Sequence, residues 1–193
     1  MSRPRTQNLL VLSAALTLVG AVGVIPAFAR PTPVDAASLA AAAGPPWISI
    51  EYPVNPFDRT TRGAHLLVHA YYHGTPIAYP VSGTAEGIVD GERRTMTLRF
   101  ETTSRTGVYA LRKQWPSEGS WTLVISVTQG EHDRGGVAQA LVELSPNGGV
   151  ASVQVPTQQH AEGAFPRRLT AQEIETAVRA QARRVALAGR ARS

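Results

Sequence analysis

Three of the five histidines of this chain lie in one stretch, residues 64–74, with the sequence AHLLVHAYYHG. His65, His69 and His73 follow one another at intervals of four residues. Imidazole is a common metal ligand, and two histidines four residues apart on a helix lie about 6 Å apart and can share a zinc ion. On a strand the same two residues lie about 13 Å apart, since each residue advances the chain by about 3.3 Å. The chemistry that this stretch can do therefore depends on its secondary structure.

The residues around these histidines favour a strand. Val68, Tyr71 and Tyr72 are of types that prefer strands, and a glycine stands on either side of the stretch. Alternation along a strand then gives it two faces. We expect Ala64, Leu66, Val68 and Ala70 to face a core, and His65, Leu67, His69 and Tyr71 to form the outer face. The three imidazoles are thus predicted to lie in a row and not around one point.

A histidine of this row can still meet a ligand from another segment. His132, which precedes Asp133, is the partner that the sequence offers. The candidate metal ligands are therefore His65, His69, His73 and His132. We nevertheless expect no bound metal and no cofactor, because the strand spacing separates the first three.

Motifs for enzymatic chemistry are missing from the sequence. There is no G-x-S-x-G segment and no S-x-x-K segment, the patterns around many nucleophilic serines. The glycine-rich segments 83–87 and 133–136 do not precede a predicted helix, so they lack the context of a phosphate-binding loop. The absence of cysteine excludes a thiolate nucleophile and an iron–sulfur cluster. We therefore expect a protein without catalytic activity.

Residues 1–29 have the three parts of a secretory signal peptide. Arg3 and Arg5 supply a positive beginning, a long apolar run follows, and Ala27 and Ala29 form the small-residue pattern of a cleavage site. We expect cleavage after Ala29. The alternative is an uncleaved N-terminal anchor, because the run is nearly long enough to span a bilayer. Either way the expected location is exported, periplasmic or extracellular.

The charge balance bears on the partners. The formal net charge of +5 is modest, decreases when Arg3 and Arg5 leave with the signal segment, and lies largely near the C-terminus, which argues against a nucleic-acid partner. An exported chain without cysteines must be held together by its core. We expect the partner to be an envelope protein. The membrane is contacted only through an uncleaved signal segment, or weakly through a basic C-terminal helix.

Three segments follow the signal. Residues 30–46 are rich in alanine and proline and are expected to form a linker. Residues 47–157 show short alternating runs separated by turn residues, typical of an all-β fold, an antiparallel β-sandwich of about seven or eight strands. The expected strands are 47–52, 64–72, 81–89, 93–102, 107–115, 120–129, 137–145 and 150–156. Asp90-Gly91 and Asn147-Gly148 have the composition of tight hairpin turns.

Residues 158–193 are expected to form a linker and one basic C-terminal α-helix. Thr170 and Glu173 have the spacing of a capping box, and Gly189 is expected to end the helix. The apolar stripe at helical intervals is Ile174, Val178, Ala182 and Val185. Either the helix packs this stripe on the sandwich, or it forms a basic arm toward anionic lipid or an acidic partner.

A further pattern reads Gly107-x-Tyr109, then Pro116-x-x-Gly119-x-Trp121-x-Leu123. In it a strand ends at a Pro/Gly turn, and an aromatic residue anchors the returning strand in the core. Over about residues 64–128 the chain resembles exported bacterial Ig-like domains, particularly the YtkA-like and FixH-type sandwiches. The resemblance implies an Ig-like β-sandwich in the cell envelope. Some members of that group occur near copper-handling or oxidase-assembly genes.

The sequence contains few suitable ligands for a copper site of the kind that this resemblance implies. Soft Cu(I) prefers thiolate or thioether sulfur, whereas cysteine is absent and Met96 is the only methionine after Met1. The predicted mature N-terminus is Arg30 and not histidine. We expect an exported, non-catalytic envelope module for binding or scaffolding. The alternative is a periplasmic metal-handling (copper-handling) accessory domain.

Overall fold

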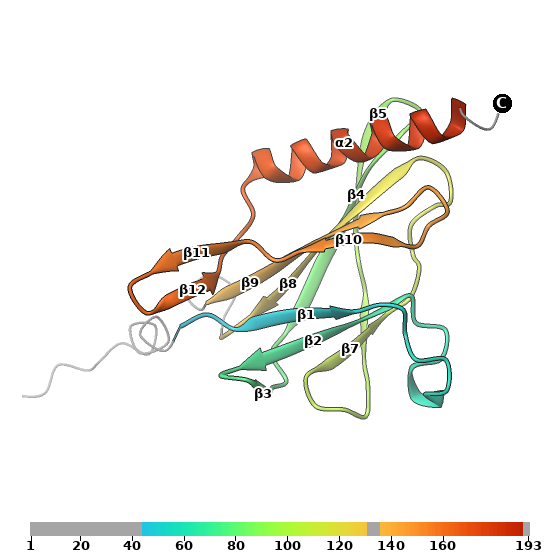
Figure 1. Ribbon diagram of the computed structural model, residues 1–193. Helices are drawn as coiled ribbons and strands as arrows, with labels where there is room; N and C mark the ends of the chain where they lie inside the picture. Colours follow the sequence, from blue (N-terminus) through green and yellow to red (C-terminus); the bar gives the residue numbers. More distant parts are fainter. Residues whose placement is uncertain (1–43, 131–135, 191–193) are drawn as a thin grey trace, which may run out of the picture. The chain divides into compact units, whose positions relative to one another are not determined.

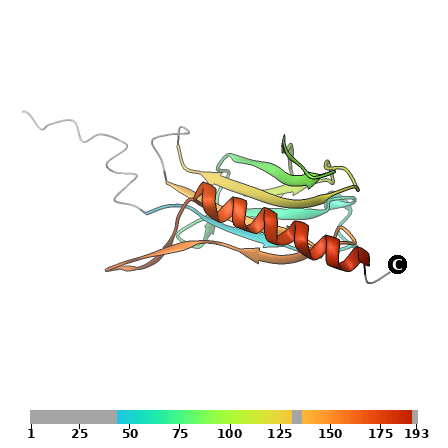
Figure 2. The same cartoon turned by 90° about the horizontal axis from the view of Figure 1, so that it is seen from above.

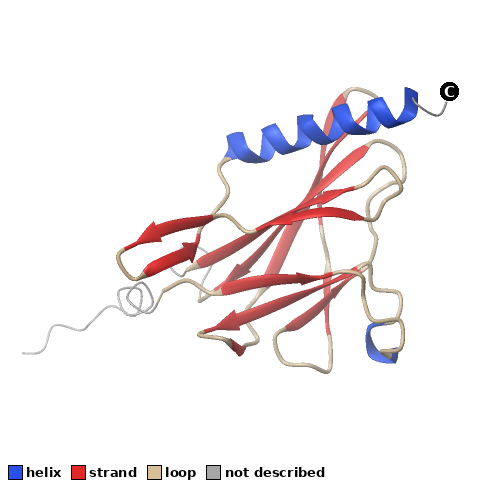
Figure 3. Cartoon of the chain, viewed as in Figure 1, coloured by secondary structure: helices blue, strands red, loops and turns tan. Residues whose placement is uncertain are grey.

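The computed structural model describes residues 44–130 and 136–190, and most of its regular structure is β-strand (Figure 3). One sheet, here called the first sheet, has the strand order β1-β2-β7-β6, with the short strand β3 paired to β2. Its strands are β1 (Trp47–Glu51), β2 (Leu66–Tyr72), β3 (Thr75–Pro76), β6 (Phe100–Thr102) and β7 (Val108–Leu111). All of its pairings are antiparallel.

The second sheet has the order β10-β9-β8-β4-β5 and is also antiparallel throughout (Figure 1). Its strands are β4 (Val81–Val89), β5 (Glu92–Thr97), β8 (Ser120–Thr128), β9 (Val137–Leu144) and β10 (Val150–Gln154). The other elements are the 3-10 turn η1 (Arg59–Thr61), the paired strands β11 (Thr157–His160) and β12 (Gly163–Pro166), and helix α2 (Ala171–Arg190). The expectation of a mostly β fold with antiparallel sheets and a C-terminal helix is confirmed.

The hydrophobic core lies between the two sheets. Leu66, Val68 and Ala70 of the first sheet share one cluster of buried side chains with Leu123 and Ile125 of the second. Each of these five residues is 0% exposed. Burying one leucine or isoleucine side chain contributes about 1.5–3 kcal/mol to folding, so this shared cluster holds the two sheets together.

The segment 93–102, expected as one strand, is divided between the sheets. β5 pairs with β4 in the second sheet, and β6 pairs with β7 in the first. Leu98 lies at the crossing and is 4% exposed, and Met96 and Phe100 pack against the core on either side. These three side chains all face the core, although they do not belong to a single strand.

Two tight turns require backbone with positive φ. Asp90 (φ 52°) and Gly91 (φ 80°) join β4 to β5, and His73 (φ 48°) and Gly74 (φ 78°) join β2 to β3. Two-residue turns with positive φ at both positions match the twist of paired strands and favour Asn, Asp and Gly. The hairpin predicted at Asp90-Gly91 is confirmed.

Helix α2 lies on the outer face of the second sheet, mainly over β8 and β4 (Figure 2). Ala177 packs against Val124 and Leu141 there, so the helix covers Val124, an apolar residue on an otherwise polar strand face. The side-chain amide of Gln181, which is 1% exposed, donates a hydrogen bond to the backbone oxygen of Leu144. Of the two interpretations of the helix, packing on the sheet is the one observed.

The N-terminus of α2 has the predicted capping box. Thr170 Oγ1 accepts a hydrogen bond from the backbone N–H of Glu173 at 3.2 Å, and the Glu173 carboxylate accepts one from the backbone N–H of Thr170 at 2.8 Å. The Arg167 guanidinium lies 2.6 Å from the same carboxylate. Arg167 and the capping bonds together lower the pKa of Glu173 to about 2, so the cap is ionised at neutral pH.

Some predicted boundaries were wrong. Gly189 does not end the helix, which continues to Arg190. Asn147-Gly148 is part of a longer connection, residues 145–149, and not a two-residue hairpin. Residues 157–166 form the strand pair β11–β12, where a linker was expected from residue 158. Every residue of β11 is exposed, so this hairpin lacks the apolar alternation by which a sequence reveals a strand.

The expected signal peptide at 1–29 and most of the expected linker at 30–46 lie outside the described residues. His132 lies in the gap at 131–135 and is outside them as well. Within residues 44–130 and 136–190, no helix combines the length and the apolar character needed to cross a membrane.

Replacing Gln181 by alanine is expected to lower the free energy of unfolding by about 1–3 kcal/mol, because the buried oxygen of Leu144 loses its donor. The matched control is Gln172→Ala on the same helix, where the side chain is exposed, and its expected effect is within about 0.5 kcal/mol of zero. Urea unfolding followed by circular dichroism measures both variants. Equal losses in the two variants would contradict the anchoring role of Gln181.

Candidate functional site

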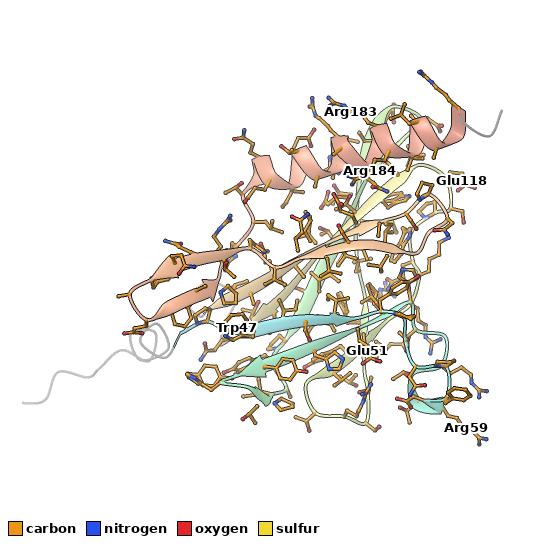
Figure 4. All side chains as sticks on the ribbon, viewed as in Figure 1. Trp47, Glu51, Arg59, Glu118, Arg183 and Arg184 are labelled. Carbon is orange, nitrogen blue, oxygen red and sulfur yellow. The ribbon has the colours of Figure 1, made fainter. Side chains whose placement is uncertain are left out.

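The pairing of β1 with β2 sets which side chains share the outer face of the first sheet. Trp47 lies opposite Tyr71, Ser49 opposite His69, and Glu51 opposite Leu67. Because Ile48 and Ile50 point into the core, these three pairs lie on the other face. Figure 4 labels Trp47 and Glu51 near the two ends of β1. The face therefore runs from an aromatic end to an acidic end.

At the acidic end, one carboxylate meets two basic side chains. The Nε2 atom of His69 lies 2.9 Å from Oε2 of Glu51. The same oxygen lies 4.0 Å from the Arg105 guanidinium, which also lies 3.7 Å from Asp58. Since a carboxylate oxygen accepts hydrogen bonds, His69 donates through Nε2. The positions of His69 and Arg105 are thus determined by acids from two other segments.

Asp58 is the second acid of this cluster. Its carboxylate accepts hydrogen bonds from the hydroxyl of Thr60 at 2.6 Å and from the backbone N–H of Thr60 at 2.9 Å. These bonds, followed by smaller effects that include Arg105, lower the pKa of Asp58. Asp58 is therefore an anion at neutral pH, and it also caps the turn η1.

A second, smaller hydrophobic cluster lies beneath the charged groups. It consists of Leu67, Val108 and Ala110, with Val54 and Ala64 packed against it. Leu67 is 0% exposed, although it belongs to the outer face of β2. The segment between β1 and β2 covers this part of the sheet, and it leaves the aromatic end open.

At the aromatic end, Trp47 is 40% exposed and Tyr71 is half-buried. The ring of Tyr71 is nearly parallel to that of His69, with 6.1 Å between centroids and 6° between planes. Trp47, Tyr71 and Gly74 line an open hollow of about 380 Å³. The sequence interpretation placed Tyr71 on the outer face but missed Trp47 as its neighbour, which requires the register of β1 against β2.

The predicted orientation of His65 was wrong. Its ring packs edge-on against Trp115 of the main core, with 5.1 Å between centroids, and lies 5.8 Å from the ring of Tyr52. Ala64, expected in the core, instead packs against the outer cluster. Regular alternation begins only at Leu66, where β2 starts, because the preceding residues follow a turn at Gly63 (φ 80°).

The three described histidines of the stretch have different neighbours. His69 meets Glu51, His65 meets Trp115, and His73 stands exposed in the turn after β2 with its ring 4.2 Å from that of Tyr72. In the described part of the chain, no group of three or more His, Cys, Asp or Glu side chains is placed to hold a metal ion. The three imidazoles do not form the predicted row on one face, because His65 turns toward the core. His132 lies outside the described residues.

A larger hollow, of about 800 Å³, lies between α2 and the strands β9 and β10. Leu141, Val155 and Leu169 give it an apolar lining. Its charged side chains hold the helix in place, because Glu143 lies 2.7 Å from Arg184 of α2 and Glu173 caps the same helix. The polar groups of this hollow are thus used in docking α2, and the first sheet is the better candidate for a ligand.

No protein-family model, curated protein or solved structure matches this chain. The described residues combine the exposed Trp47 and the half-buried Tyr71 with a hydrogen-bonded charged cluster on one sheet face.

His65 should make stability depend on pH. Burial, and then the charge of Lys113, lowers the pKa of His65 below its ordinary 6.5. The unfolded chain therefore binds this proton more readily than the folded chain, so the free energy of unfolding decreases as the pH falls below about 7. The variant His65→Phe keeps the aromatic contacts and cannot titrate. We expect it to lose less stability than the wild type between pH 7.5 and 5.5, in thermal melts.

The exposed turn residue provides the control for this experiment. His73→Asn suits the positive φ at that position and removes an imidazole that is not buried. It should keep the pH dependence of the wild type. A wild-type slope in His65→Phe would show that burial of this imidazole does not set the pH dependence.

Proposed function

We propose that this chain is an exported, non-catalytic binding module of the cell envelope, and that its ligand face is the aromatic end of the first sheet. The observation that carries the proposal is the pair Trp47–Tyr71, which lines an open hollow next to the ordered His69–Glu51 pair. Aromatic side chains in such positions give large contact area and are frequent anchors in binding sites.

The strand order supports an Ig-like β-sandwich. In Ig constant-type domains one sheet has the order A-B-E-D and the other contains C, F and G. If β1, β2, β7 and β6 are taken as A, B, E and D, then β4, β8 and β9 take the places of C, F and G, with β5 and β10 at the edges. The resemblance to YtkA-like and FixH-type domains points the same way.

Trp121 of the resembling motif has a place that suits this fold. It is 5% exposed in the main core, and its indole N–H donates to the backbone oxygen of Glu118 at 2.9 Å. Glu118 lies in the Pro116–Gly119 turn of the motif, so the turn and the aromatic anchor are joined directly. This is the role that the spacing of the motif predicts for the tryptophan.

The charged cluster supports binding rather than catalysis. Glu51 is occupied by His69 and Arg105, and Asp58 by Thr60 and Arg105. A general acid needs a proton to give at neutral pH, and the lowered pKa of Asp58 works against that role. The cluster is thus better suited to holding the face rigid than to transferring protons.

Export can be tested separately from binding. We expect mass spectrometry of the protein secreted by a bacterial host to find a chain that begins at Arg30. Ala29→Leu places a bulky residue at the cleavage site, so the uncleaved chain should accumulate. Ala37→Leu, beyond the site, is the matched control and should be processed normally. An intact N-terminus in the wild-type protein would support the uncleaved anchor instead.

Binding is tested by co-sedimentation of the exported protein with isolated cell-envelope material. Trp47→Ala and Tyr71→Ala are each expected to weaken binding about tenfold or more, because loss of an aromatic anchor costs at least about 1.4 kcal/mol. Phe57→Ala is the matched control, since Phe57 is 90% exposed and lies outside the hollow. Wild-type binding by Trp47→Ala, or an equal loss in Phe57→Ala, would refute the assignment of the site.

A further inference from the structure

We infer that the hollow at Trp47 binds one sugar ring of a neutral glycan, an inference that rests on the proposed binding function. The hollow, of about 380 Å³, falls in the range of small-molecule sites. Of the three described residues that line it, two are aromatic and none is charged. A ligand for it needs an apolar face for the rings and hydrogen-bonding groups at its edge. A pyranose has both, since C–H bonds cover its faces and hydroxyls surround them.

The exposure of the tryptophans singles out Trp47. The chain has three tryptophans, and Trp115 and Trp121 are 4% and 5% exposed, whereas Trp47 is 40% exposed. Trp47 lies directly across the strand pair from Tyr71, and both residues line the hollow. Aromatic faces are electron-rich and attract the positive edge of C–H bonds. The pair therefore offers a stacking platform at the edge of the sheet.

Next to this platform, His69 supplies a hydrogen-bond acceptor. Nε2 of His69 donates to Glu51, so in a ring that carries a single proton Nδ1 is left as an acceptor. Among the described residues Nδ1 has no hydrogen-bond partner of its own. The His69 ring is stacked on Tyr71, which places it beside the platform. A ligand hydroxyl can donate to an acceptor of this kind.

The charges around the hollow favour a neutral ligand. None of the described residues that line it is charged. Toward the other end of β1, Glu51 and Asp58 are already paired with Arg105 and accept hydrogen bonds from His69 and Thr60. A charged ligand would lose hydration at the hollow without gaining an opposite charge, a cost that a ligand with hydroxyls and no charge avoids.

Gly74 keeps the hollow open. It lines the hollow, and a Cβ at its position would meet no atom within 4 Å, so a side chain there would extend into open space. Its φ of 78° restricts the residues that can replace it to types that tolerate this backbone, asparagine foremost. Gly74→Asn therefore adds a side chain to the hollow without disturbing the core. Gly91→Asn, at the same position of the β4–β5 turn with φ 80°, is its matched control.

The experiment is a calorimetric titration of the intact exported protein with three neutral probes, chitotriose, cellotriose and maltotriose. We expect saturable binding of at least one probe, with a blue shift of tryptophan emission as Trp47 is covered. Tyr71→Ala and Gly74→Asn should each weaken that binding at least tenfold, and Gly91→Asn should leave it unchanged. Thermal midpoints within a few degrees of the wild type would show that the variants are folded.

The inference is overturned if none of the probes binds, or if Gly74→Asn and Gly91→Asn bind alike. Its failure is distinguishable from failure of the proposed function. If Trp47→Ala abolishes envelope binding while no probe binds, the binding function stands and the saccharide does not.

The envelope material itself gives a second test. Periodate, which cleaves the vicinal diols of sugars, should abolish its capture of the protein, whereas protease treatment should not. The opposite pattern would identify a protein ligand at the same face. A Trp47-dependent dimer in sedimentation analysis would identify a second copy of the chain. Either result would overturn the saccharide inference.

Discussion

The antiparallel pairing of β1 with β2 determines what the first sheet presents to its surroundings. In a strand the two faces alternate at every residue, so a shift of one position would exchange the inner and outer faces. The observed register puts Ile48 and Ile50 into the core, and with the same step it puts Trp47 beside Tyr71 and Ser49 beside His69. Burial of Ile48 and Ile50 thus also determines where Trp47 and Ser49 lie on the opposite face.

The outer faces of the two sheets are covered to different extents. On the second sheet, α2 covers Val124 and Leu141, and a buried acid, Glu86, is held by Thr84, Thr95 and Arg93. On the first sheet no helix of the described residues plays this part. The segment between β1 and β2 covers only the region around Leu67. Among the described residues, the aromatic end of the first sheet is therefore left uncovered, whereas the middle of the second sheet is covered by α2.

Much of the fold could be predicted from local patterns. Strand alternation correctly placed Leu66, Val68 and Ala70, and the Asp-Gly turn and the capping box at Thr170 appeared as expected, because each depends on neighbours in the sequence. His65 was misplaced because alternation holds only inside a strand and β2 begins one residue later. The burial of Val124 could not be predicted, because its partner, Ala177, is distant in the chain. Only part of the candidate site could be predicted from the sequence. Alternation placed Tyr71 on the outer face, but its pairing with Trp47 depends on the register of β1 against β2, which the sequence does not state.

The chain crosses from the second sheet to the first between β5 and β6, and this crossing couples the stability of the two sheets. Leu98 lies at this crossing inside the shared core, and the two sheets cannot separate without exposing it. We therefore expect the two sheets to unfold together, so that a substitution beneath α2 also lowers the fraction of molecules that present the face around Trp47. Residues far from that face can thus change how much of it is present without altering any side chain on it.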